Sequence, residues 1–232
     1  KTPEVKIITV EDPIEYQLAG ILQTQVDEAN GYTFSTALRS LLRQNPNIVM
    51  IGEIRDDETA KIAYQAALTG HLVMATLHTN NASGSIARLL SMGVRPDDIV
   101  NAGGVYVAQR LVRTLCSCKK ESLLEGDAKV TVEKALASFS SNAKVSLPET
   151  NHHFLPVGCE RCNGTGYKGR VALSEALLLD KDIQLLISRG ALGVEIEEQA
   201  VKNGMVTMFQ DGILRVLAGE TSLDEVLRVA GS

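Results

Sequence analysis

The sequence has no tryptophan, and its 232 residues include only four Phe and five Tyr. Proteins that bind single-stranded nucleic acid by stacking its bases need aromatic side chains, so we expect no such platform. Positive charge is not in excess either, because 23 Lys and Arg residues stand against 28 Asp and Glu residues. A surface that binds nucleic-acid phosphates is therefore not expected to be the main activity of the chain, and we predict no nucleic-acid partner.

Long apolar runs are also missing. No run approaches the roughly 20 residues that a membrane span needs. The first residue is Lys1 rather than Met, and the first ten residues lack the apolar core of a signal peptide. With 44% hydrophobic and 22% charged residues, the composition is that of an ordinary globular protein. We expect a soluble, cytoplasmic part of a longer protein.

Cysteine is scarce and unevenly placed. The four cysteines form two close pairs, Cys116 with Cys118 and Cys159 with Cys162. The disulfide framework of a secreted protein is usually denser and shorter, and no export signal is present. Cysteine pairs in a reducing compartment indicate metal binding first and redox chemistry second.

The first part of the chain alternates between strand and helix patterns, which predicts an α/β fold with a parallel sheet and crossover helices. Apolar, partly β-branched runs predict strands at Val5–Val10, Ile48–Ile51 and Leu72–Leu77. Helices are expected after a cap at Thr33 or Ser35, from the acidic run at 56–58 to Gly70, and around Ile86–Met92.

Changes in composition along the sequence divide the chain into three parts. Residues 1–115 carry the strand–helix alternation. Residues 116–170 hold all four cysteines and a polar stretch, and we expect a loop-rich element there. Residues 171–232 are expected to be mainly helical, with helices over Val194–Asn203, Phe209–Leu217 and Ser222–Val229.

Ionisable residues flank the predicted strands. Glu11 ends the first strand, Glu53 follows the second, and His71 and His78 flank the third. Ligands of parallel sheets bind at the carboxyl ends of the strands, where these residues other than His71 are expected to meet. Two carboxylates could orient a water molecule and hold Mg²⁺ through water, while His or Arg acts on a phosphate. Taken alone, each residue could equally be a surface acid or a hydrogen-bonded structural histidine.

Several segments resemble motifs of one family. Ile8–Tyr16 resembles the acidic Asp box of secretion ATPases, Ile51–Asp56 resembles their Walker B segment, and Thr69–Leu72 with Thr76–Asn80 resembles their His box. Gly166–Arg170 and Asp211–Ile213 also fit. Over nearly its whole length, the chain resembles the type II secretion and type IV pilus assembly (extension) ATPases, which are RecA-like hexameric motors.

The resemblance implies ATP and Mg²⁺ as cofactors and assigns roles to five residues. Glu11 matches the glutamate thought to polarise the attacking water, and Glu53 matches the Walker B glutamate near Mg²⁺. His71 and His78 match the histidine pair that links the γ-phosphate site to subunit geometry, and Arg55 is a neighbouring candidate for binding nucleotide. The implied partners are further copies in a hexamer and the inner-membrane platform proteins of a pilus or secretion apparatus, with the motor bound peripherally at that membrane.

One expected motif is missing. Nothing in the sequence matches the P-loop pattern G-x-x-x-x-G-K-[ST], whose backbone amides and Lys hold phosphates. The stretch from Gly164 to Gly169 is similar but continues with Arg170, and it follows a cysteine pair rather than a strand. The resemblance places the P-loop upstream of Lys1. We therefore expect this chain alone to hydrolyse almost no ATP.

The cysteines predict a structural zinc site. Cys159-Glu-Arg-Cys162 has the spacing of a zinc knuckle, and with Cys116 and Cys118 it would complete a Cys₄ site. The family that this chain resembles commonly has such a four-cysteine element. The spacing Cys116-Ser117-Cys118 is one residue tighter than usual, and it suits a metal only if Ser117 lies in a turn.

Two other functions stay open at this point. The chain could be a zinc-stabilised interaction module that docks on membrane-platform proteins without hydrolysing ATP. More distantly, it could be a redox protein or a chaperone-type zinc protein, because the pattern C-x-x-C-x-G-x-G also occurs, repeated, in DnaJ-type chaperones. His152 and His153 are expected to be solvated in a polar loop and are left out of the metal site.

Overall fold

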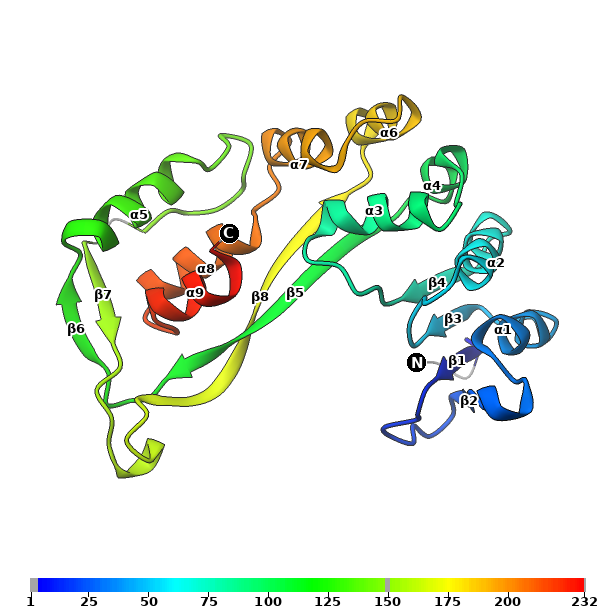
Figure 1. Cartoon of the computed structure of the whole chain (residues 1–232), viewed down its shortest axis with the longest axis horizontal. Helices are drawn as coiled ribbons and strands as arrows, with labels where there is room; N and C mark the ends of the chain where they lie inside the picture. The colour runs from blue at the N-terminus through cyan, green and yellow to red at the C-terminus, as the bar shows by residue number, and fades with distance from the viewer. Residues whose placement is uncertain (1–3, 149–150, 232) are drawn as a thin grey trace. The chain divides into compact units, whose positions relative to one another are not determined.

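The computed structural model describes residues 4–148 and 151–231. The chain divides into two compact units (Figure 1). The first comprises Lys1–Thr79, Gly84–Gly104 and Gln184–Gly193, and the second comprises Asn80–Ser83, Val105–Ile183 and Val194–Ser232.

A parallel sheet forms the centre of the first unit. Its strands are β1 (Ile7–Glu11), β2 (Leu22–Gln25), β3 (Ile48–Ile51) and β4 (Leu72–Ala75), in the order β2-β1-β3-β4. The predicted parallel arrangement of β1, β3 and β4 is confirmed. Strand β2 was not predicted, because its sequence Leu-Gln-Thr-Gln is short and mostly polar. Val10 pairs with Ile51, and Ile51 with Ala75, so the carboxyl ends of three strands lie together.

Helices α1 (Phe34–Leu42) and α2 (Asp57–Leu68) begin at capping residues that the sequence signals. The Thr33 hydroxyl accepts from the Thr36 amide, and Asp56 accepts from the Thr59 amide at 2.7 Å. Each cap satisfies an amide that has no partner within the helix. These helices bury an apolar face that includes Phe34, Leu38, Leu41, Ile62 and Ala63. A 3-10 turn (Glu28–Asn30) precedes α1, and two consecutive helices, α3 (Ala82–Ser91) and α4 (Pro96–Ala102), follow β4.

The two faces of this sheet differ in their exposure. Val49 and Ile51 point to one face and are buried, whereas Met50, Leu72 and Met74 point to the other and are 40%, 57% and 48% exposed. Parallel sheets are usually covered on both faces. Within the described part of the first unit, therefore, one apolar face of the sheet lacks, at β3 and β4, the cover that its composition favours.

The second unit is built on a long antiparallel ribbon, β5 (Val105–Leu115) paired with β8 (Tyr167–Leu178) (Figure 1). Helices α8 (Met208–Leu217) and α9 (Leu223–Ala230) pack on it and bury Leu173, Ile213 and Val226 completely. The ribbon pairs residues of the stretches 1–115 and 171–232, which the composition predicts to be separate parts. Helix α7 (Gly193–Lys202) lies almost wholly in this unit, whereas most of α6 (Lys181–Ser188) groups with the first unit.

The cysteine-bearing stretch has more regular structure than expected. It contains β6 (Lys120–Leu123), α5 (Gly126–Ala137), β7 (His152–Leu155) and the 3-10 turn Glu160–Cys162, with β6 antiparallel to β7. The expectation of a solvated loop is wrong for His153, which lies in β7 and is only 8% exposed. Strand β7 pairs with β6 and packs against α8. None of the described helices is long and apolar enough to cross a membrane.

Candidate functional site

Acidic and basic side chains from three strand ends meet at the carboxyl edge of the first unit's sheet. Arg55 Nη2 donates to Glu53 Oε1 at 2.6 Å, and His78 Nε2 lies 3.1 Å from Glu53 Oε2. Arg55 Nη1 also reaches Asp12 Oδ2 at 3.0 Å. We call Asp12, Glu53, Arg55 and His78 the acid–base group. It joins the ends of β1, β3 and β4, as the sequence pattern predicts for that edge.

Charge pairing within this group shifts the pKa values of Glu53 and Arg55. The hydrogen bond from Arg55 lowers the pKa of Glu53, burial opposes that shift, and His78 lowers the pKa further. In return, Glu53 and then Asp12 raise the pKa of Arg55. Both side chains are therefore charged at neutral pH, and the Glu53 carboxylate is held between two donors.

Gly52 brings the ends of β1 and β3 together. Its amide donates to the Val10 carbonyl at 2.7 Å, and Thr76 Oγ1 donates to the Gly52 carbonyl at 2.5 Å. A Cβ atom at this position would lie 3.1 Å from the Val10 carbonyl oxygen and 3.3 Å from Glu11 Cα. The missing side chain thus allows the close approach that places Glu53 beside the end of β1.

Glu11 lies at the same edge but has partners of its own. Its Oε1 accepts from the Thr9 hydroxyl and from Gln23 Nε2, the latter at 2.9 Å. These bonds fix the orientation of the carboxylate between β1 and β2. No direct bond joins Glu11 to the acid–base group, although the adjacent Asp12 belongs to it.

His71 lies at the opposite end of β4. Its Nδ1 is 3.0 Å from the Ala66 carbonyl and 3.2 Å from Thr69 Oγ1, where α2 ends. The structure therefore brings His78, and not His71, to Glu53.

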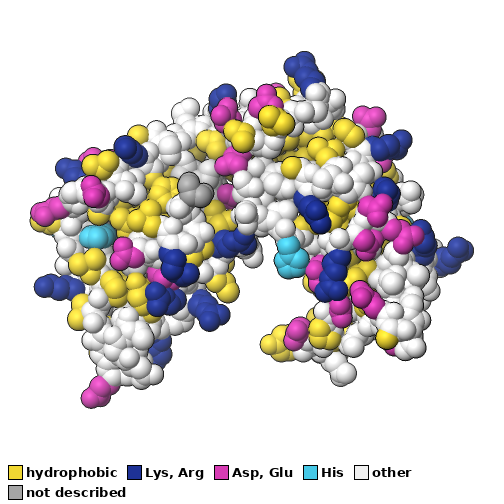
Figure 2. Space-filling model, in the orientation of Figure 1, with side chains coloured by type: hydrophobic (Ala, Val, Ile, Leu, Met, Phe, Trp, Pro, Cys, Tyr) yellow, Lys and Arg dark blue, Asp and Glu magenta, His cyan; other side chains and the backbone are white. Residues whose placement is uncertain are grey.

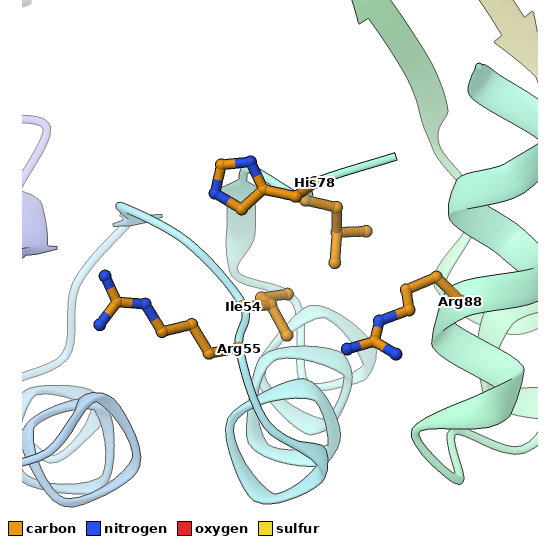
Figure 3. A pocket seen from close by; sticks show the side chains of 5 residues that line it. Ile54, Arg55, His78 and Arg88 are labelled. Carbon is orange, nitrogen blue, oxygen red and sulfur yellow. The ribbon is translucent and has the colours of Figure 1, made fainter. Parts of the chain in front are cut away.

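A pocket of about 350 Å³ opens beside the acid–base group and is lined by Ile54, Arg55, Leu77, His78 and Arg88 (Figure 3). In this view Ile54 lies between the two guanidinium groups. Arg88, on α3, was not predicted as a site residue, because its only sequence signal is its place on the helix after the His78 strand. Two guanidinium groups and an imidazole suit an anion such as phosphate. Elsewhere on the visible face of this unit, acidic and basic side chains intermingle (Figure 2).

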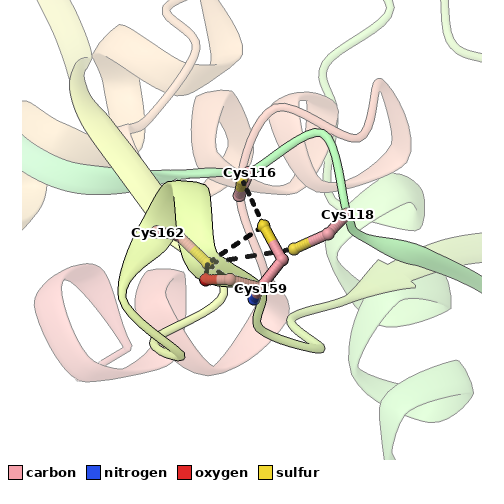
Figure 4. Close-up of side chains that lie close together, drawn as sticks. All are labelled: Cys116, Cys118, Cys159 and Cys162. Carbon is pink, nitrogen blue, oxygen red and sulfur yellow. Dashed lines mark hydrogen bonds between the residues drawn. The ribbon is translucent and has the colours of Figure 1, made fainter.

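The four cysteines form a compact cluster in the second unit (Figure 4). The distances between sulfur atoms are 3.9 Å for Cys116–Cys159, 3.9 Å for Cys118–Cys162 and 3.8 Å for Cys159–Cys162. None of the four is in a disulfide. A tetrahedral zinc site with Zn–S bonds of ~2.3 Å separates its sulfurs by about 3.8 Å. The donor set and its spacing therefore fit zinc.

Backbone geometry supports this cluster. Ser117 lies in a turn in which the Lys119 amide donates to the Cys116 carbonyl at 2.9 Å, as the tight spacing requires. Cys162 Sγ accepts from the amides of Cys159 and Gly166 at 3.1 and 3.3 Å. Burial raises the pKa of Cys162, but these two bonds, together with those from the Cys159 and Cys118 thiols, outweigh it and lower the pKa to about 6, which favours the thiolate that a metal needs.

The family described as "Type II/IV secretion system protein" matches residues 1–228. The chain belongs to this family. Among its relatives, the type IV pilus assembly ATPase PilB of Thermus thermophilus is 48% identical over 227 residues, which is 97% of this chain and 24% of that protein. The type II secretion system protein E of Aeromonas hydrophila is 46% identical over 224 residues, which is 96% of this chain and 42% of that protein.

Solved structures of lower identity share the fold of this family member. The ATPase DotB of Legionella pneumophila superposes with a TM-score of 0.63 at 22% identity, covering 98% of this chain and 52% of that one. The pilus retraction motor PilT with bound ADP gives 0.63 at 24% identity, covering 98% and 53%. The RecA-like fold class is thus confirmed. The chain spans less than half the length of the two relatives above.

Proposed function

We propose that this chain is the part of a pilus-assembly or type II secretion ATPase that positions catalytic side chains around the γ-phosphate of ATP. The observation that carries the proposal is the acid–base group beside a pocket lined by Arg55, His78 and Arg88. A cluster of this kind at the carboxyl edge of a parallel sheet is suited to phosphate chemistry, and packing alone does not require it.

The bonds of each side chain support a role in that reaction. Glu11, oriented by Thr9 and Gln23, would accept a hydrogen bond from the attacking water. Glu53 would face Mg²⁺ through water, with Arg55 and His78 keeping it ionised. When bound, ATP supplies the phosphoryl group, and Mg²⁺ supplies a positive counter-charge. His71 would act differently from His78, because it holds the end of α2.

We further propose that the phosphate cradle lies in a part of the protein outside these 232 residues. The uncovered sheet face around Met50, Leu72 and Met74 supports this, because an apolar face of a parallel sheet is normally covered. Strand β4 is also an edge strand with no charged residue to discourage pairing. The occupant we propose is the P-loop segment of the same protein.

Assembly belongs to the same proposal. Motors of this type act as hexamers, with nucleotide between neighbouring subunits, and bind peripherally to platform proteins of the inner membrane. The cysteine cluster favours a second candidate, a zinc-stabilised module that docks on such platform proteins without hydrolysis, because zinc would stabilise the second unit independently of ATP.

The decisive experiment compares the whole protein, its Glu11→Gln variant and this chain alone. Glu11→Gln keeps the side chain's size and removes its charge, so nucleotide binding should persist while turnover falls by about 10²-fold or more. The chain alone should show almost no turnover, because nothing in it neutralises the β- and γ-phosphates as a P-loop does.

Steady-state hydrolysis and nucleotide affinity are measured on all three. Near-normal turnover by Glu11→Gln would contradict the role assigned to Glu11. Robust turnover by this chain alone would contradict the proposal that the phosphate cradle lies outside these residues. A whole wild-type protein that binds no ATP would leave the zinc-stabilised module as the function.

A further inference from the structure

We infer that the connection between β1 and β2, residues 12–21, sets the orientation of Glu11 through the side chain of Gln23 and joins Glu11 to the acid–base group. The connection and both residues belong to the first unit (Figure 1). The kinetic consequence of this inference rests on the proposed function, whereas its structural consequence does not.

The register of the sheet brings Gln23 next to Glu11. Gln23 pairs with Thr9 across β1 and β2, and Glu11 follows Thr9 by two residues. Side chains two residues apart on a strand point to the same face, and so do register partners on neighbouring strands. Thr9 is 2% exposed and also pairs with Met50, so the face that is open at β3 and β4 is closed at β1. Gln23 therefore meets Glu11 on a covered part of this face.

The side-chain amide of Gln23 uses both of its N–H groups. Its Nε2 donates to Glu11 Oε1 and to the Tyr16 carbonyl, in each case at 2.9 Å. Its Oε1 accepts from the Leu18 amide at 2.6 Å. A backbone N–H can only donate, so Leu18 determines which end of the amide is the oxygen. The connection thereby turns the NH₂ group of Gln23 toward the Glu11 carboxylate.

The two oxygens of Glu11 are left in different situations. Oε1 accepts from Gln23 and from the Thr9 hydroxyl. Oε2 has no hydrogen-bond partner in the part of the chain that the structure describes. Two donors on one oxygen fix the direction of the carboxylate, and the free lone pairs of the other can accept from water. Gln23 thus determines which oxygen meets the attacking water in the proposed reaction.

The connection also begins at the acid–base group. Its first residue is Asp12, whose Oδ2 accepts from Arg55 Nη1 at 3.0 Å. From there the chain continues to residues 16–18, which bind Gln23. One short segment therefore binds the acid–base group at its start and, through Gln23, the Glu11 carboxylate further along. It is the link between two parts of the proposed site that share no direct bond.

The outer side of the connection is open to solvent. Tyr16 and Leu18 are 79% and 53% exposed. At these two positions the connection is held by its backbone bonds to Gln23 and not by burial of its side chains. Packing therefore does little to resist a change in its backbone, and such a change reaches Gln23 directly.

Two variants of Leu18 test this coupling. Leu18→Pro removes the N–H that binds the Gln23 oxygen, since proline has no backbone donor. Leu18→Ala is the matched control, because it keeps the amide and shortens an exposed side chain. The readout is the carboxyl-carbon signal of Glu11 by NMR in this chain. We expect Leu18→Pro to shift this signal and Leu18→Ala to leave it unmoved. An unmoved signal in Leu18→Pro, or an equal shift in Leu18→Ala, would overturn the inference.

A second pair of variants acts on β2 and decides the question should Leu18→Pro not fold. Gln23→Met keeps an unbranched side chain and removes all three hydrogen bonds. Gln25→Met is its control, because Gln25 Oε1 accepts from the Ile14 amide at 3.3 Å but its side chain has no bond to the Glu11 carboxylate. The Glu11 signal should shift in Gln23→Met alone. A shift in both variants, or in neither, would contradict the inference.

Turnover is then measured in the whole protein. Because misplacing a reacting group costs rate rather than binding, Gln23→Met should lower kcat about tenfold while KM for ATP stays within about twofold. Gln25→Met should keep its kcat. Adding Gln23→Met to Glu11→Gln should cost no further turnover, because the carboxylate that Gln23 positions is already gone.

A further tenfold loss in this double variant would show that Gln23 acts other than through Glu11 and would overturn the kinetic part of the inference. Equal losses in Gln23→Met and Gln25→Met would reduce Gln23 to a structural role. A whole wild-type protein without ATPase activity would refute the proposed function, and the Glu11 signal would still decide whether the connection orients the carboxylate.

Discussion

Glu53 and His78 are 25 residues apart in sequence, yet Oε2 of one lies 3.1 Å from Nε2 of the other. They meet because β3 and β4 are parallel neighbours whose carboxyl ends are aligned, with Ile51 opposite Ala75. Arg55 completes the contact from the other side of the carboxylate. Because Glu53 is bound from two sides, removing one of these partners should change its pKa.

Arg55→Gln should raise the pKa of Glu53. The hydrogen bond from Arg55 is the largest cause that lowers this pKa, and a neutral amide replaces it only in part. Since the folded pKa is below the unfolded one, the pair stabilises the fold above the ordinary carboxyl range and loses that effect as pH falls through the folded pKa. Carboxyl titration by NMR measures it. Lys61→Gln, which removes a partner of Asp57, should leave the Glu53 midpoint unchanged.

The sequence was sufficient to predict the parts of the site that depend on local signals. Short apolar runs predicted β1, β3 and β4, and the acids that follow the first two marked the edge where ligands bind. Parallel strands place their carboxyl ends together, so the meeting of Glu53 and His78 followed from the alternating pattern, whereas at the end of β1 it is Asp12 and not the expected Glu11 that joins them.

The features that the sequence did not predict depend on contacts between distant residues. The pairing of β5 with β8 spans the whole cysteine-bearing stretch, and no turn signal announces it. Glu175 on β8 is another such feature. In the sequence it is an acid in an alternating strand, and only the structure shows that its carboxylate accepts from the amides of Ala82 and Met208. His153 was misjudged because a pair of histidines in a polar context gives no sign of β7 packing on α8.

Glu225 should contribute much of the stability of the second unit. It is 1% exposed and accepts hydrogen bonds from Arg113 and Arg228 on both oxygens, which hold its pKa far below the usual value. Glu225→Gln should lower the free energy of unfolding by about 2–3 kcal/mol, at the low end for a buried charge because both arginines are half exposed. Urea unfolding at pH 7 measures this.

The control is Glu133→Gln, which removes an exposed partner of Lys129 and should cost less than about 0.5 kcal/mol. The pH dependence has a definite sign. A carboxyl group with a lowered folded pKa stabilises fully above its unfolded pKa, so the difference between wild type and Glu225→Gln should shrink from about pH 5 toward pH 2. A difference that is independent of pH over this range would contradict the ion-pair explanation.

This chain should be monomeric or weakly associated in solution. If nucleotide and the P-loop segment contribute to the ring interface, as proposed, most of that interface is absent from these residues. Light scattering over a concentration series should give a mass near the 25.0 kDa of one chain. A stable hexamer without nucleotide would show that the described residues form the ring contacts by themselves.

The cysteine cluster should bind one zinc ion per chain, without a role in hydrolysis. Four thiolates close the coordination shell and leave no position for a reacting water molecule, so the metal stabilises structure only. Metal analysis of protein purified without chelator should give one zinc, and Cys162→Ser should give close to none. Ser117→Ala, a change between two of the ligands, should retain the metal.

Removing the metal should destabilise the second unit in particular. A structural site couples metal binding to folding, so a strong chelator should lower the unfolding temperature and expose the turns at Ser117 and Glu160–Cys162 to hydrogen exchange. The sheet of the first unit, which contains no cysteine, should keep its exchange protection. Zinc well below one per chain, together with four thiols that react freely in the folded protein, would show that the cluster is held by backbone packing alone.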